Sequence, residues 1–332
     1  MSALPDHGER PLVSIVVPML DERDRIELCL RGIEVQSYPL DRLEVLVVDG
    51  GSTDGSLELV AKLQRDRPWL RLVDNPKRKA SAAFNRGIEA SRGDVVILLS
   101  SHGEVGPDFV RLSVQALEET GAAGVGGILR HEGDDPDGVA IGMAMTSPAG
   151  MASPFRYASS RRSVDTIGHP AYRRSALDQV GPFDESLERN SDYELNYRMR
   201  RAGHELLFDP EIVTLYRPRG SLVELARQFW WYGRWKAHVV RRQPRSMQPR
   251  HAVAPLAVAS VVLAPLIARL PLGRVALLAG ATGYCALIAA ATVAAKPGSH
   301  GARTRTFVLA FPVMHGTWGA GFLATVLTGW RR

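Results

Sequence analysis

Cysteine is nearly absent from this chain of 332 residues. The two cysteines, Cys29 and Cys285, lie far apart in the sequence. A disulfide framework needs several cysteines at recurring spacings, and a cysteine zinc site needs them in close pairs. The sequence therefore predicts neither a disulfide-stabilised fold nor a zinc site built from cysteines.

Acidic residues are missing from the last third of the chain. No Asp or Glu follows Glu224, so any catalytic carboxylate must lie within the first 224 residues. Residues 217–250 carry nine Lys or Arg against Glu224 alone, which gives this segment a charge of +8, whereas the whole chain has +6. The positive charge is thus concentrated just before the most apolar part of the chain.

Long apolar runs fill the region that lacks acids. Each run approaches the ~20 residues needed to cross a bilayer. Three prolines within them argue against a hydrophobic soluble helical domain, since an interior proline costs a soluble helix ~3 kcal/mol. We therefore predict three membrane helices within residues 251–330. The runs are residues 252–270, 272–295 and 307–329, and the prolines are Pro255, Pro265 and Pro312.

The basic segment predicts the orientation in the membrane. Residues 1–11 are polar and do not resemble a signal peptide. By the positive-inside rule, the N-terminal domain is expected in the cytoplasm, in a multi-pass protein of the inner (plasma) membrane. Three spans place Arg331 and Arg332 outside, in conflict with the same rule. If one run lies at the interface instead, the C-terminus returns inside.

Strands and helices alternate in the first 100 residues. Short apolar runs predict strands, and the spacing of Ile26, Leu30 and Ile33 predicts a helix. This order predicts an α/β fold with a mostly parallel, doubly wound sheet in a domain of residues 11–220. The predicted strands are residues 12–17, 43–48, 70–73 and 94–99, and the predicted helices are residues 23–36, residues 54–64 and a helix that reaches Ala90.

The second predicted strand ends in a candidate ligand loop. Asp49 closes the apolar run and is followed by the sequence G-G-S-T-D-G-S. Ligands of open α/β sheets bind at the carboxyl ends of the strands, and Gly50, Gly51 and Gly55 let the backbone approach closely. A strand-to-helix turn without a ligand is the alternative.

The fourth predicted strand ends in S-S-H-G-E, residues 100–104, at the same edge of the sheet. Mg²⁺ or Mn²⁺ prefers a few protein ligands together with phosphate oxygens, and His102 is a possible ligand. The alternative is that His102 only donates a hydrogen bond to a phosphate or a loop. Further along, Asp134, Asp135 and Asp137 form an acidic turn that we interpret as a solvated loop rather than a cation site.

A helix is predicted from residue 189 to residue 201, with Ser191 as a possible N-cap. Leu195, Met199 and Ala202 form its predicted buried stripe. Asp192 stands at the helix N-terminus, where a carboxylate is electrostatically favoured. That position suits a general base that takes a proton from an attacking hydroxyl. A capping aspartate without chemistry is the alternative.

Together these motifs resemble family 2 glycosyltransferases of the GT-A fold, whose sheet is Rossmann-like. The resemblance extends over residues 11–245 and is strongest to the membrane-bound branch that builds exopolysaccharide on lipid carriers, such as succinoglycan-type glucosyltransferases. It is carried by V-V-P-M-L-D-E at residues 16–22, the loop after Asp49, N-P-K-R-K-A-S-A-A-F-N-R-G at residues 75–87, S-S-H at residues 100–102 and R-N-S-D-Y-E-L-N-Y-R at residues 189–198.

The resemblance implies a nucleotide-sugar site at the strand ends. Asp49 would bind uracil or ribose, and the acidic D-x-D motif of the family would fall on Ser100, Ser101 and His102. The chain departs from the family there, because both aspartates are missing. This leaves His102 as the candidate ligand of a Mg²⁺ or Mn²⁺ cofactor. The remaining residues implied to line the nucleotide-sugar are Pro18, Asp21, Glu22, Lys79 and Asn85.

The resemblance also implies the chemistry. Asp192 matches the aspartate of the family's E-D motif, the general base of an inverting transfer, with Ser191 in place of the glutamate and Glu194 in support. The acceptor hydroxyl would attack the anomeric carbon while the diphosphate leaves with its developing charge neutralised. A single displacement inverts the anomeric configuration.

The basic segment begins with an amphipathic helix, predicted within residues 221–250. Its apolar residues Leu222, Leu225, Phe229 and Tyr232 follow helical spacing, and tryptophans stand among its Arg and Lys residues. Trp and basic residues on one helix are typical of a membrane interface, so anionic lipid is a better partner than nucleic acid. The residues predicted to face the acceptor and the membrane are Gln228, Arg234 and Trp235.

The sequence thus predicts a membrane glycosyltransferase with a cytosolic catalytic domain. It would move a sugar from a nucleotide-sugar, with UDP as the expected nucleotide, to a lipid-linked or polysaccharide acceptor. One alternative is a polyprenyl-phosphate glycosyltransferase, which makes the lipid-linked sugar itself. The other is a weakened, non-catalytic glycan-assembly partner, an idea that rests on the missing aspartates at Ser100 and Ser101.

Overall fold

The computed structural model describes residues 10–101, 103–150, 158–216 and 220–329. The chain divides into two compact units. Met1–Arg130 and Ala158–Tyr216 form the first, named here the α/β unit, and His131–Tyr157 and Arg217–Arg332 form the second, named the helical unit. The predicted boundary near residue 220 is close to this division. However, residues 131–157, which we expected within the N-terminal domain, belong to the helical unit.

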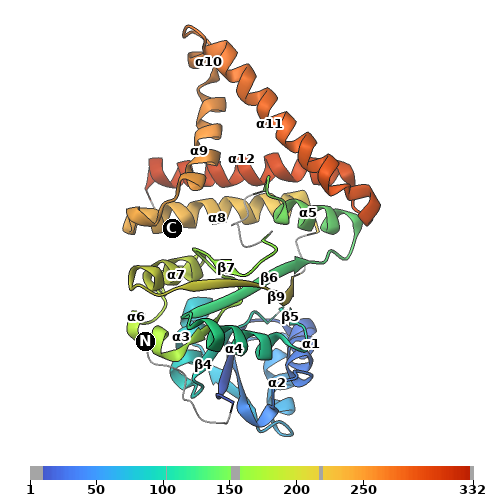
Figure 1. Ribbon diagram of the computed structural model, residues 1–332, viewed down its shortest axis with the longest axis vertical. Helices are drawn as coiled ribbons and strands as arrows, with labels where there is room; N and C mark the ends of the chain where they lie inside the picture. Colours follow the sequence, from blue (N-terminus) through green and yellow to red (C-terminus); the bar gives the residue numbers. More distant parts are fainter. Residues whose placement is uncertain (1–9, 102, 151–157, 217–219, 330–332) are drawn as a thin grey trace. The chain divides into compact units, whose positions relative to one another are not determined.

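The first half of the α/β unit is the predicted parallel sheet. Its strands lie in the order β3-β2-β1-β4, and all three pairs are parallel. The helices that connect them begin and end within two residues of the bounds that the sequence predicts. Figure 1 shows these helices beside the sheet. The elements are β1 (Val13–Met19), α1 (Arg23–Glu34), β2 (Leu43–Asp49), α2 (Ser56–Gln64), β3 (Leu70–Asp74), α3 (Ala80–Ala90) and β4 (Val95–Leu98).

The second half of the sheet is antiparallel, so the sheet as a whole is mixed. β8 pairs with β4 in the antiparallel sense, β6 pairs with β8, and β5 and β7 pair with β9. Several of these strands are only two or three residues long, too short to give a periodic signal in the sequence. The five strands of this half are β5 (Glu104–Val105), β6 (Gly124–His131), β7 (Arg162–Ser163), β8 (Ala171–Arg173) and β9 (Leu206–Tyr216). The helices between them in the α/β unit are α4 (Phe109–Thr120), α6 (Arg174–Val180) and α7 (Ser191–Arg201).

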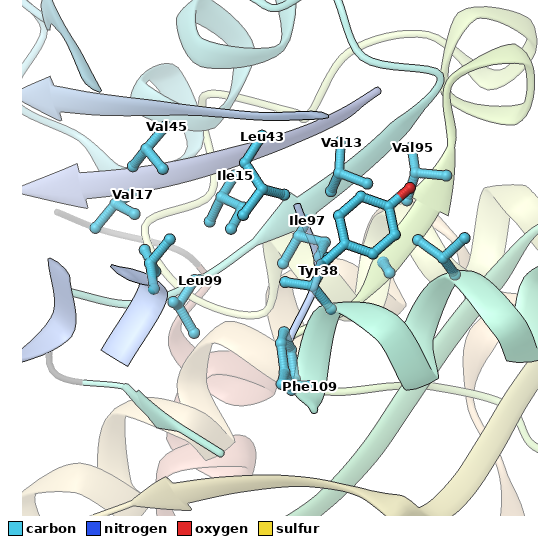
Figure 2. Packing of buried hydrophobic residues seen from close by; sticks show 14 of the residues in the cluster. Val13, Ile15, Val17, Tyr38, Leu43, Val45, Val95, Ile97, Leu99 and Phe109 are labelled. Carbon is cyan, nitrogen blue, oxygen red and sulfur yellow. The ribbon is translucent and has the colours of Figure 1, made fainter. Parts of the chain in front are cut away.

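Successive residues of the parallel strands point to opposite faces, and helices cover both. Val13, Ile15 and Val17 of β1 pack in one buried cluster with residues of α1 and α4, as Figure 2 shows for the strand side chains. Val16 lies in a second cluster with residues of α3 and α7. A strand buried on both faces reads as a continuous apolar run, which is why the sequence indicated these strands clearly.

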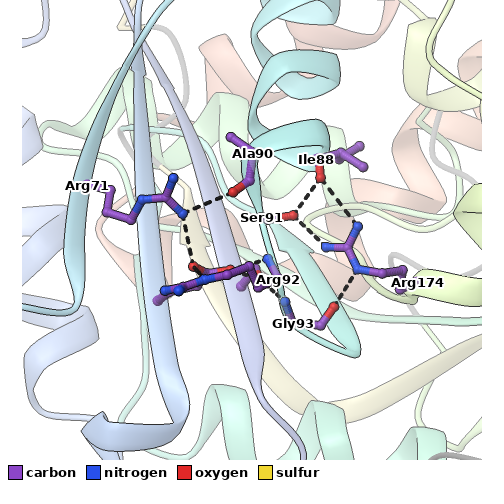
Figure 3. Close-up of polar contacts among 9 residues, drawn as sticks. Arg71, Ile88, Ala90, Ser91, Arg92, Gly93 and Arg174 are labelled. Atoms are coloured by element: carbon purple, nitrogen blue, oxygen red, sulfur yellow. Dashed lines mark hydrogen bonds and ion pairs between the residues drawn. The ribbon is translucent and has the colours of Figure 1, made fainter.

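A buried carboxylate fastens the amino ends of the parallel strands. Glu44 of β2 is 3% exposed and accepts hydrogen bonds from the Ser14 hydroxyl at 2.6 Å and from the backbone N–H of Arg92. It also forms ion pairs with the guanidinium groups of Arg71 (3.2 Å) and Arg92 (3.3 Å) (Figure 3). The loop between α3 and β4 is thereby tied to the edge of the sheet that lies opposite the candidate ligand loops.

The helical unit contains the apolar C-terminal region. Its helices are α5 (Pro136–Thr146), α8 (Leu222–Arg242), α9 (Pro249–Val262), α10 (Ala264–Ile267), α11 (Gly273–Ala295) and α12 (Thr304–Thr328). Two of them, α11 and α12, are long and apolar enough to cross a membrane. The first of the three predicted spans, residues 252–270, is instead divided between α9 and α10, which meet at Leu263.

Close backbone packing joins α8, α9 and α12. A Cβ atom on Gly233 of α8 would lie 2.0 Å from the carbonyl oxygen of Trp318, and one on Gly321 of α12 would lie 2.3 Å from that of Trp230. The apolar stripe of α8 packs in this core, so it does not form the free membrane-facing surface that we predicted. The stripe residues Leu225 and Phe229 share a buried cluster with residues of α12.

The acidic turn that we interpreted as a solvated loop has structural partners. The carboxylate of Asp135 caps α5 by accepting hydrogen bonds from the backbone N–H groups of Asp137 (2.9 Å) and Gly138 (2.8 Å). Asp137 forms an ion pair with Arg303 at 2.8 Å and accepts a hydrogen bond from Thr306. These contacts hold α5 against the start of α12 and explain why residues 131–157 belong to the helical unit.

Candidate active site

The loops that follow β1, β2, β3 and β4 emerge at one edge of the sheet, because these four strands are parallel neighbours. The predicted residues from Pro18 to Ser101 lie in or beside these loops. Pro18 is part of β1 and is paired in register with Val48 of β2. On its other side the pairing of β1 with β4 has already ended at Val16, so the missing N–H of proline is tolerated.

Asp21 joins the loop after β1 to the loop after β2 through hydrogen bonds. Its backbone adopts a left-handed conformation (φ 54°), and its carboxylate accepts a hydrogen bond from the backbone N–H of Thr53 at 2.7 Å. Its own N–H donates to the hydroxyl of Ser52 at 2.9 Å. The next residue, Glu22, donates its backbone N–H to the hydroxyl of Ser56 at 2.9 Å. The loops after β1 and β2 therefore form one preorganised surface, with Asp21 and Thr53 exposed.

Asp49 shapes this surface from beneath. The residue is 3% exposed, and its carboxylate accepts hydrogen bonds from the Ser52 hydroxyl (2.6 Å) and the backbone N–H of Gly51 (2.8 Å). The backbone N–H of Ser52 also points at it, at 3.1 Å. We expected Asp49 to contact the base or ribose directly. Its oxygens are committed to its own loop, so the geometry favours a role in loop shape.

The turn between β3 and α3 is anchored to the segment that follows α6. The ammonium group of Lys79 donates to the carbonyl of Glu185 at 3.2 Å, and the side-chain amide of Asn85 donates to the carbonyl of Phe183 at 3.0 Å. The hydrogen bonds from Lys77 and then Asn85 lower the pKa of Glu185. Asn85 thus holds α3 to this segment. Lys79 is half-buried, and its contact with the base and diphosphate stays a prediction.

The turn after β4 holds Ser100, which is half-buried, and Ser101, which is 4% exposed. The predicted metal ligand His102 lies outside the described residues. Among the residues that the structure describes, no group of three or more His, Cys, Asp or Glu is placed to hold a metal ion. Ser101 is too deeply buried to meet a ligand without movement of the turn.

His169 lies at this turn and was not singled out from the sequence. It precedes β8, and because β8 runs antiparallel to β4, the start of β8 lies beside the end of β4. The His169 ring is 3.6 Å from the position of a Cβ atom on Gly103, and its φ of 42° is left-handed, which is unusual for a residue other than glycine. A backbone in this conformation is a signal of function that the sequence does not show.

The predicted base, Asp192, is the second residue of α7 and is exposed. Burial first, and then the charge of Asp192, raise the pKa of Tyr172 well above its ordinary value, which places the Asp192 carboxylate near this residue of β8. The Tyr172 hydroxyl donates to the side-chain carbonyl of Asn196, whose amide donates to Thr166 at 2.9 Å. This buried chain fixes α7 while its N-terminus faces solvent.

Glu194 anchors the same helix from the other side. It is 5% exposed and forms an ion pair with Arg198 at 2.9 Å. Arg198 in turn donates to the carbonyls of Val180 (2.6 Å) and Pro182 (2.8 Å). The N-cap of α7 is Asn190 and not Ser191 as we expected. The last residue of the predicted buried stripe, Ala202, is exposed because the helix has ended.

The residues predicted to face the acceptor and the membrane lie on α8. Gln228 is 7% exposed and donates to the Tyr232 hydroxyl at 2.9 Å. Trp235 is 2% exposed, so it is a core side chain and not the interfacial ring that we predicted. The guanidinium carbon of Arg234 lies 5.1 Å from the centre of the Trp231 ring, and this tryptophan is the exposed one.

Comparison with known proteins identifies the family. The model of the family described as "Glycosyl transferase family 2" matches residues 14–181, which include every loop of the candidate site up to α6. The chain belongs to glycosyl transferase family 2. This family 2 glycosyltransferase is 32% identical over 333 residues to the succinoglycan biosynthesis protein ExoA of Rhizobium meliloti (strain 1021), an alignment that covers 96% of each protein.

Another relative is similar in sequence, and two solved structures are similar in fold. A dolichyl N-acetyl-α-D-glucosaminyl phosphate 3-β-D-2,3-diacetamido-2,3-dideoxy-β-D-glucuronosyltransferase of Methanococcus voltae is 29% identical over 69% of this chain and 74% of its own length. The mannosyltransferase PcManGT of Pyrobaculum calidifontis, solved with GDP-Man and Mn²⁺, has a TM-score of 0.63 at 23% identity, covering 99% of this chain and 90% of that one. TarS of S. aureus, residues 1–349 with UDP, has a TM-score of 0.53 at 13% identity, covering 96% and 93%.

These findings confirm the predicted family, the GT-A fold and the enzyme class. The chain is a glycosyltransferase that resembles proteins of exopolysaccharide and glycan biosynthesis. Its solved neighbours bind nucleotide-sugars or nucleotides, and one of them also holds Mn²⁺.

Proposed function

We propose that the enzyme transfers a sugar, with inversion, from a nucleotide-sugar to a lipid-linked or polysaccharide acceptor at the cytoplasmic membrane face. The observation that carries this proposal is the placement of Asp192. It is an exposed carboxylate on a helix whose buried side is locked by Asn196 and by the ion pair of Glu194 with Arg198. A fixed, accessible carboxylate is what a general base requires.

The donor is proposed to bind on the loop surface built by Asp21, Ser52 and Thr53. These residues are held by hydrogen bonds between two loops before any ligand arrives, which reduces the ordering cost of binding. Asp49 contributes by fixing the loop, and Lys79 adds a positive charge at its border. The expected nucleotide part of the donor is UDP, in keeping with the resemblance to family 2 glycosyltransferases.

In this mechanism the acceptor hydroxyl gives its proton to Asp192 as its oxygen attacks the anomeric carbon. The glycosidic bond to the diphosphate breaks on the opposite face, and the bonding electron pair leaves with the diphosphate. Glu194 and Asn196 act on this step only by holding α7 in place. Removal of the proton as the new bond forms avoids a positively charged acceptor oxygen, which is the contribution expected of a general base.

The described residues do not make a metal site by themselves. The turn after β4 offers hydroxyls where a carboxylate pair would suit Mg²⁺ or Mn²⁺, and no cluster of three suitable ligands is present in the part of the chain that the structure describes. We therefore derive no step through a cation. The predicted metal stays a prediction that depends on His102.

The acceptor is proposed from the relatives and the helical unit. The relative from Methanococcus voltae is named for an acceptor in which a sugar is linked to dolichyl phosphate, and ExoA is named for succinoglycan biosynthesis. Two apolar helices follow the catalytic region of the chain. A lipid-linked acceptor at the inner membrane is consistent with both observations.

Nucleotide release by the full chain in membranes tests the proposal. UDP-sugars and GDP-sugars are offered with extracted lipid-linked acceptor, with Mn²⁺ or with a chelator. We expect turnover with one donor class and a fall of about 10²- to 10⁴-fold in kcat for Asp192→Asn. Asp178→Asn changes an exposed carboxylate of α6 and serves as the matched control, with no loss expected.

Three results would change this view. If Asp192→Asn retains activity within a few-fold of the parent, Asp192 is not the base. If turnover is unaffected by the chelator, the predicted cation is unnecessary. If polyprenyl phosphate alone is glycosylated, the enzyme makes the lipid-linked sugar and does not extend it.

A further inference from the structure

Helix α11 is apolar on every side. None of its 18-residue apolar window is buried inside the protein, and it contains exposed leucine and valine residues all around its circumference, such as Val275, Leu278, Leu287 and Val293. The same holds for the second half of α9 and for α10, where Val261, Val262 and Leu266 are exposed. A helix that is hydrophobic all round needs an apolar environment, so both arms of this hairpin match the hydrocarbon of a bilayer.

Helix α12 differs, because it lies along α8. Gly233 of α8 abuts the backbone of Trp318, and farther along both helices Arg241 lies beside Gly329, with its guanidinium nitrogen 3.6 Å from the position of a Cβ atom there. The two helices therefore run side by side in the same direction, as Figure 1 shows. Packed in this way, they must have the same inclination to a membrane.

Helix α8 cannot cross the hydrocarbon. It carries charged residues at its start, middle and end, among them Glu224, Arg227, Arg234, Lys236 and Arg241. Charged side chains in the middle of a bilayer are strongly disfavoured, whereas a helix that mixes Arg, Lys and Trp suits the interface. Since α12 runs parallel to α8 and packs against it, it does not cross either, although its length and composition would permit it.

We propose that the chain crosses the membrane twice, through the hairpin of α9–α10 and α11, while α8 and α12 lie side by side at the interface. From Pro249 to Ile267 the first arm is about 28 Å long, and α11 is about 34 Å long, at ~1.5 Å per residue. Both lengths are close to the ~30 Å of a hydrocarbon core. Arg269 lies between the arms and Arg274 at the start of α11, and both would lie in the opposite headgroup layer.

The charges and one polar contact agree with this topology. Seven basic residues flank the hairpin at its base, against the two at its tip, so the positive-inside rule keeps the base in the cytoplasm. The Tyr284 hydroxyl, at the middle of α11, lies 2.8 Å from the Nδ1 atom of His315 on α12, so the second half of α11 descends alongside the interfacial helix. The basal residues are Arg241, Arg242, Arg245, Arg250, Lys296, Arg303 and Arg305.

This topology places the C-terminus on the cytoplasmic side. It removes the conflict that three spans create for Arg331 and Arg332, and it gives the catalytic chain an even number of crossings. The inference rests on the proposed membrane location of the helical unit, and it adds which helices enter the bilayer.

Single cysteines in the full chain test the topology. The background is Cys29→Ala with Cys285→Ser, because SDS would expose Cys29, which is 2% exposed in the folded chain. Leu270→Cys reports the hairpin tip, Thr328→Cys reports the end of α12, and Met247→Cys is the control between α8 and α9. Bacterial spheroplasts receive a membrane-impermeant maleimide before or after permeabilisation, and an SDS-treated sample shows that each thiol can react.

We expect Leu270→Cys to be labelled in intact spheroplasts, and Thr328→Cys and Met247→Cys only after permeabilisation. Labelling of Thr328→Cys in intact spheroplasts would overturn the inference, because α12 would then cross. Protection of Leu270→Cys in intact spheroplasts would also overturn it, because the hairpin would not reach the far side. Alkaline carbonate extraction separates this from the proposed function: release of the protein from membranes refutes the membrane location itself.

Discussion

The α/β unit and the helical unit are joined internally by different chemistry. In the α/β unit, loops and helices are fastened by buried polar groups, such as Glu44 at one edge of the sheet and Asn85 and Asn196 at the other. In the helical unit, α8, α9 and α12 meet through glycines, where backbone lies against backbone. The ion pair between Asp137 and Arg303 lies where α5 joins α12.

The proposed membrane location of the helical unit would account for this difference. A polar network in a water-soluble domain exchanges one set of hydrogen bonds for another, and its net contribution stays modest. Helices that enter a bilayer gain nothing from the hydrophobic effect against one another, so close packing at small residues becomes the main source of association. The elements before Glu224 are therefore held together in part by carboxylates, and the helices after it by close packing at glycines.

The largest effect is expected for Gly233→Val. A Cβ atom at this position would lie 2.0 Å from the carbonyl oxygen of Trp318, and backbone cannot move aside as a flexible side chain can. We expect the separation of α8 from α12 to cost about 3 kcal/mol, at the upper end of the range for overpacking. Thermal unfolding of the purified full chain in detergent measures the loss.

Gly280→Ala is the matched control on α11. Nothing lies within 4 Å of the position of its Cβ atom, so the substitution meets open space. Alanine is the better helix former by ~1 kcal/mol, and we expect equal or slightly higher stability. If Gly233→Val unfolds at the same temperature as Gly280→Ala, glycine packing does not hold the helical unit together.

A smaller effect is expected for Glu44→Ala in the α/β unit. The substitution leaves the buried Ser14 hydroxyl and the backbone N–H of Arg92 without their acceptor, at a cost of about 2 kcal/mol. The site lies at the opposite edge of the sheet, so kcat and KM at a permissive temperature should equal those of the parent. A change in KM for the donor would show that the two edges of the sheet are coupled.

Most of the α/β unit could be predicted from the sequence. The strands of the parallel half are buried on both faces, and this gives strong apolar runs with clear ends at Asp49 and near Ser100. The pairing of the antiparallel half could not be predicted, because β5, β7 and β8 are short and all of its strands depend on partners far along the chain. One example is Gly127 of β6, whose missing side chain makes room for the backbone of Ile212.

The roles within the site were harder to predict than its location. The sequence indicated Asp49, Asn85 and Glu194 as polar residues at the right places, but not that their side chains are committed to neighbouring backbone or to Arg198. Such commitments depend on loop geometry, which has no periodic signal. His169 was missed for the same reason, since its significance comes from its backbone conformation and its neighbour Gly103.

For the helical unit, the sequence predicted apolar helices but not their pairing. Composition alone made residues 307–329 a membrane span as suitable as α11. Only the contacts of Gly233 and Gly321 show that α12 lies along the charged helix α8. Small residues within a long apolar run are a weak signal, because they also occur where nothing packs against the helix, as at Gly280 and Gly283.

Asp49→Ala is expected to affect binding more than folding. Without the carboxylate, Gly51 and Ser52 lose the acceptor that shapes their loop, and the donor must order it on binding. We expect KM for the nucleotide-sugar to rise about tenfold, equivalent to about 1.4 kcal/mol, with little change in kcat. Steady-state kinetics against Asp49→Asn, which keeps one acceptor oxygen, provide the control. A loss confined to kcat would instead point to direct contact with the reacting groups.

The smallest effect is a pH dependence that belongs to the α/β unit alone. Burial acts to raise the pKa of Glu44, but the hydrogen bonds from Ser14 and Arg92 outweigh it and hold the pKa below the ordinary value of 4.5. A carboxyl group whose pKa is lower in the folded state stabilises the fold above its unfolded pKa, and this stabilisation is lost as the pH falls through the folded value. Glu44→Gln has no such titration.

The difference in Tm between the parent and Glu44→Gln should therefore be largest near neutral pH and shrink below about pH 4.5. Other carboxylates with lowered pKa values, such as Asp108 and Glu185, titrate in both proteins, so their contributions cancel in the difference. We expect a narrowing of about 2–4 °C for each kcal/mol involved. A difference in Tm that stays constant from pH 7 to acidic pH would mean that Glu44 acts through packing and not through its charge. The two units would then not differ in their use of electrostatic interactions at this position.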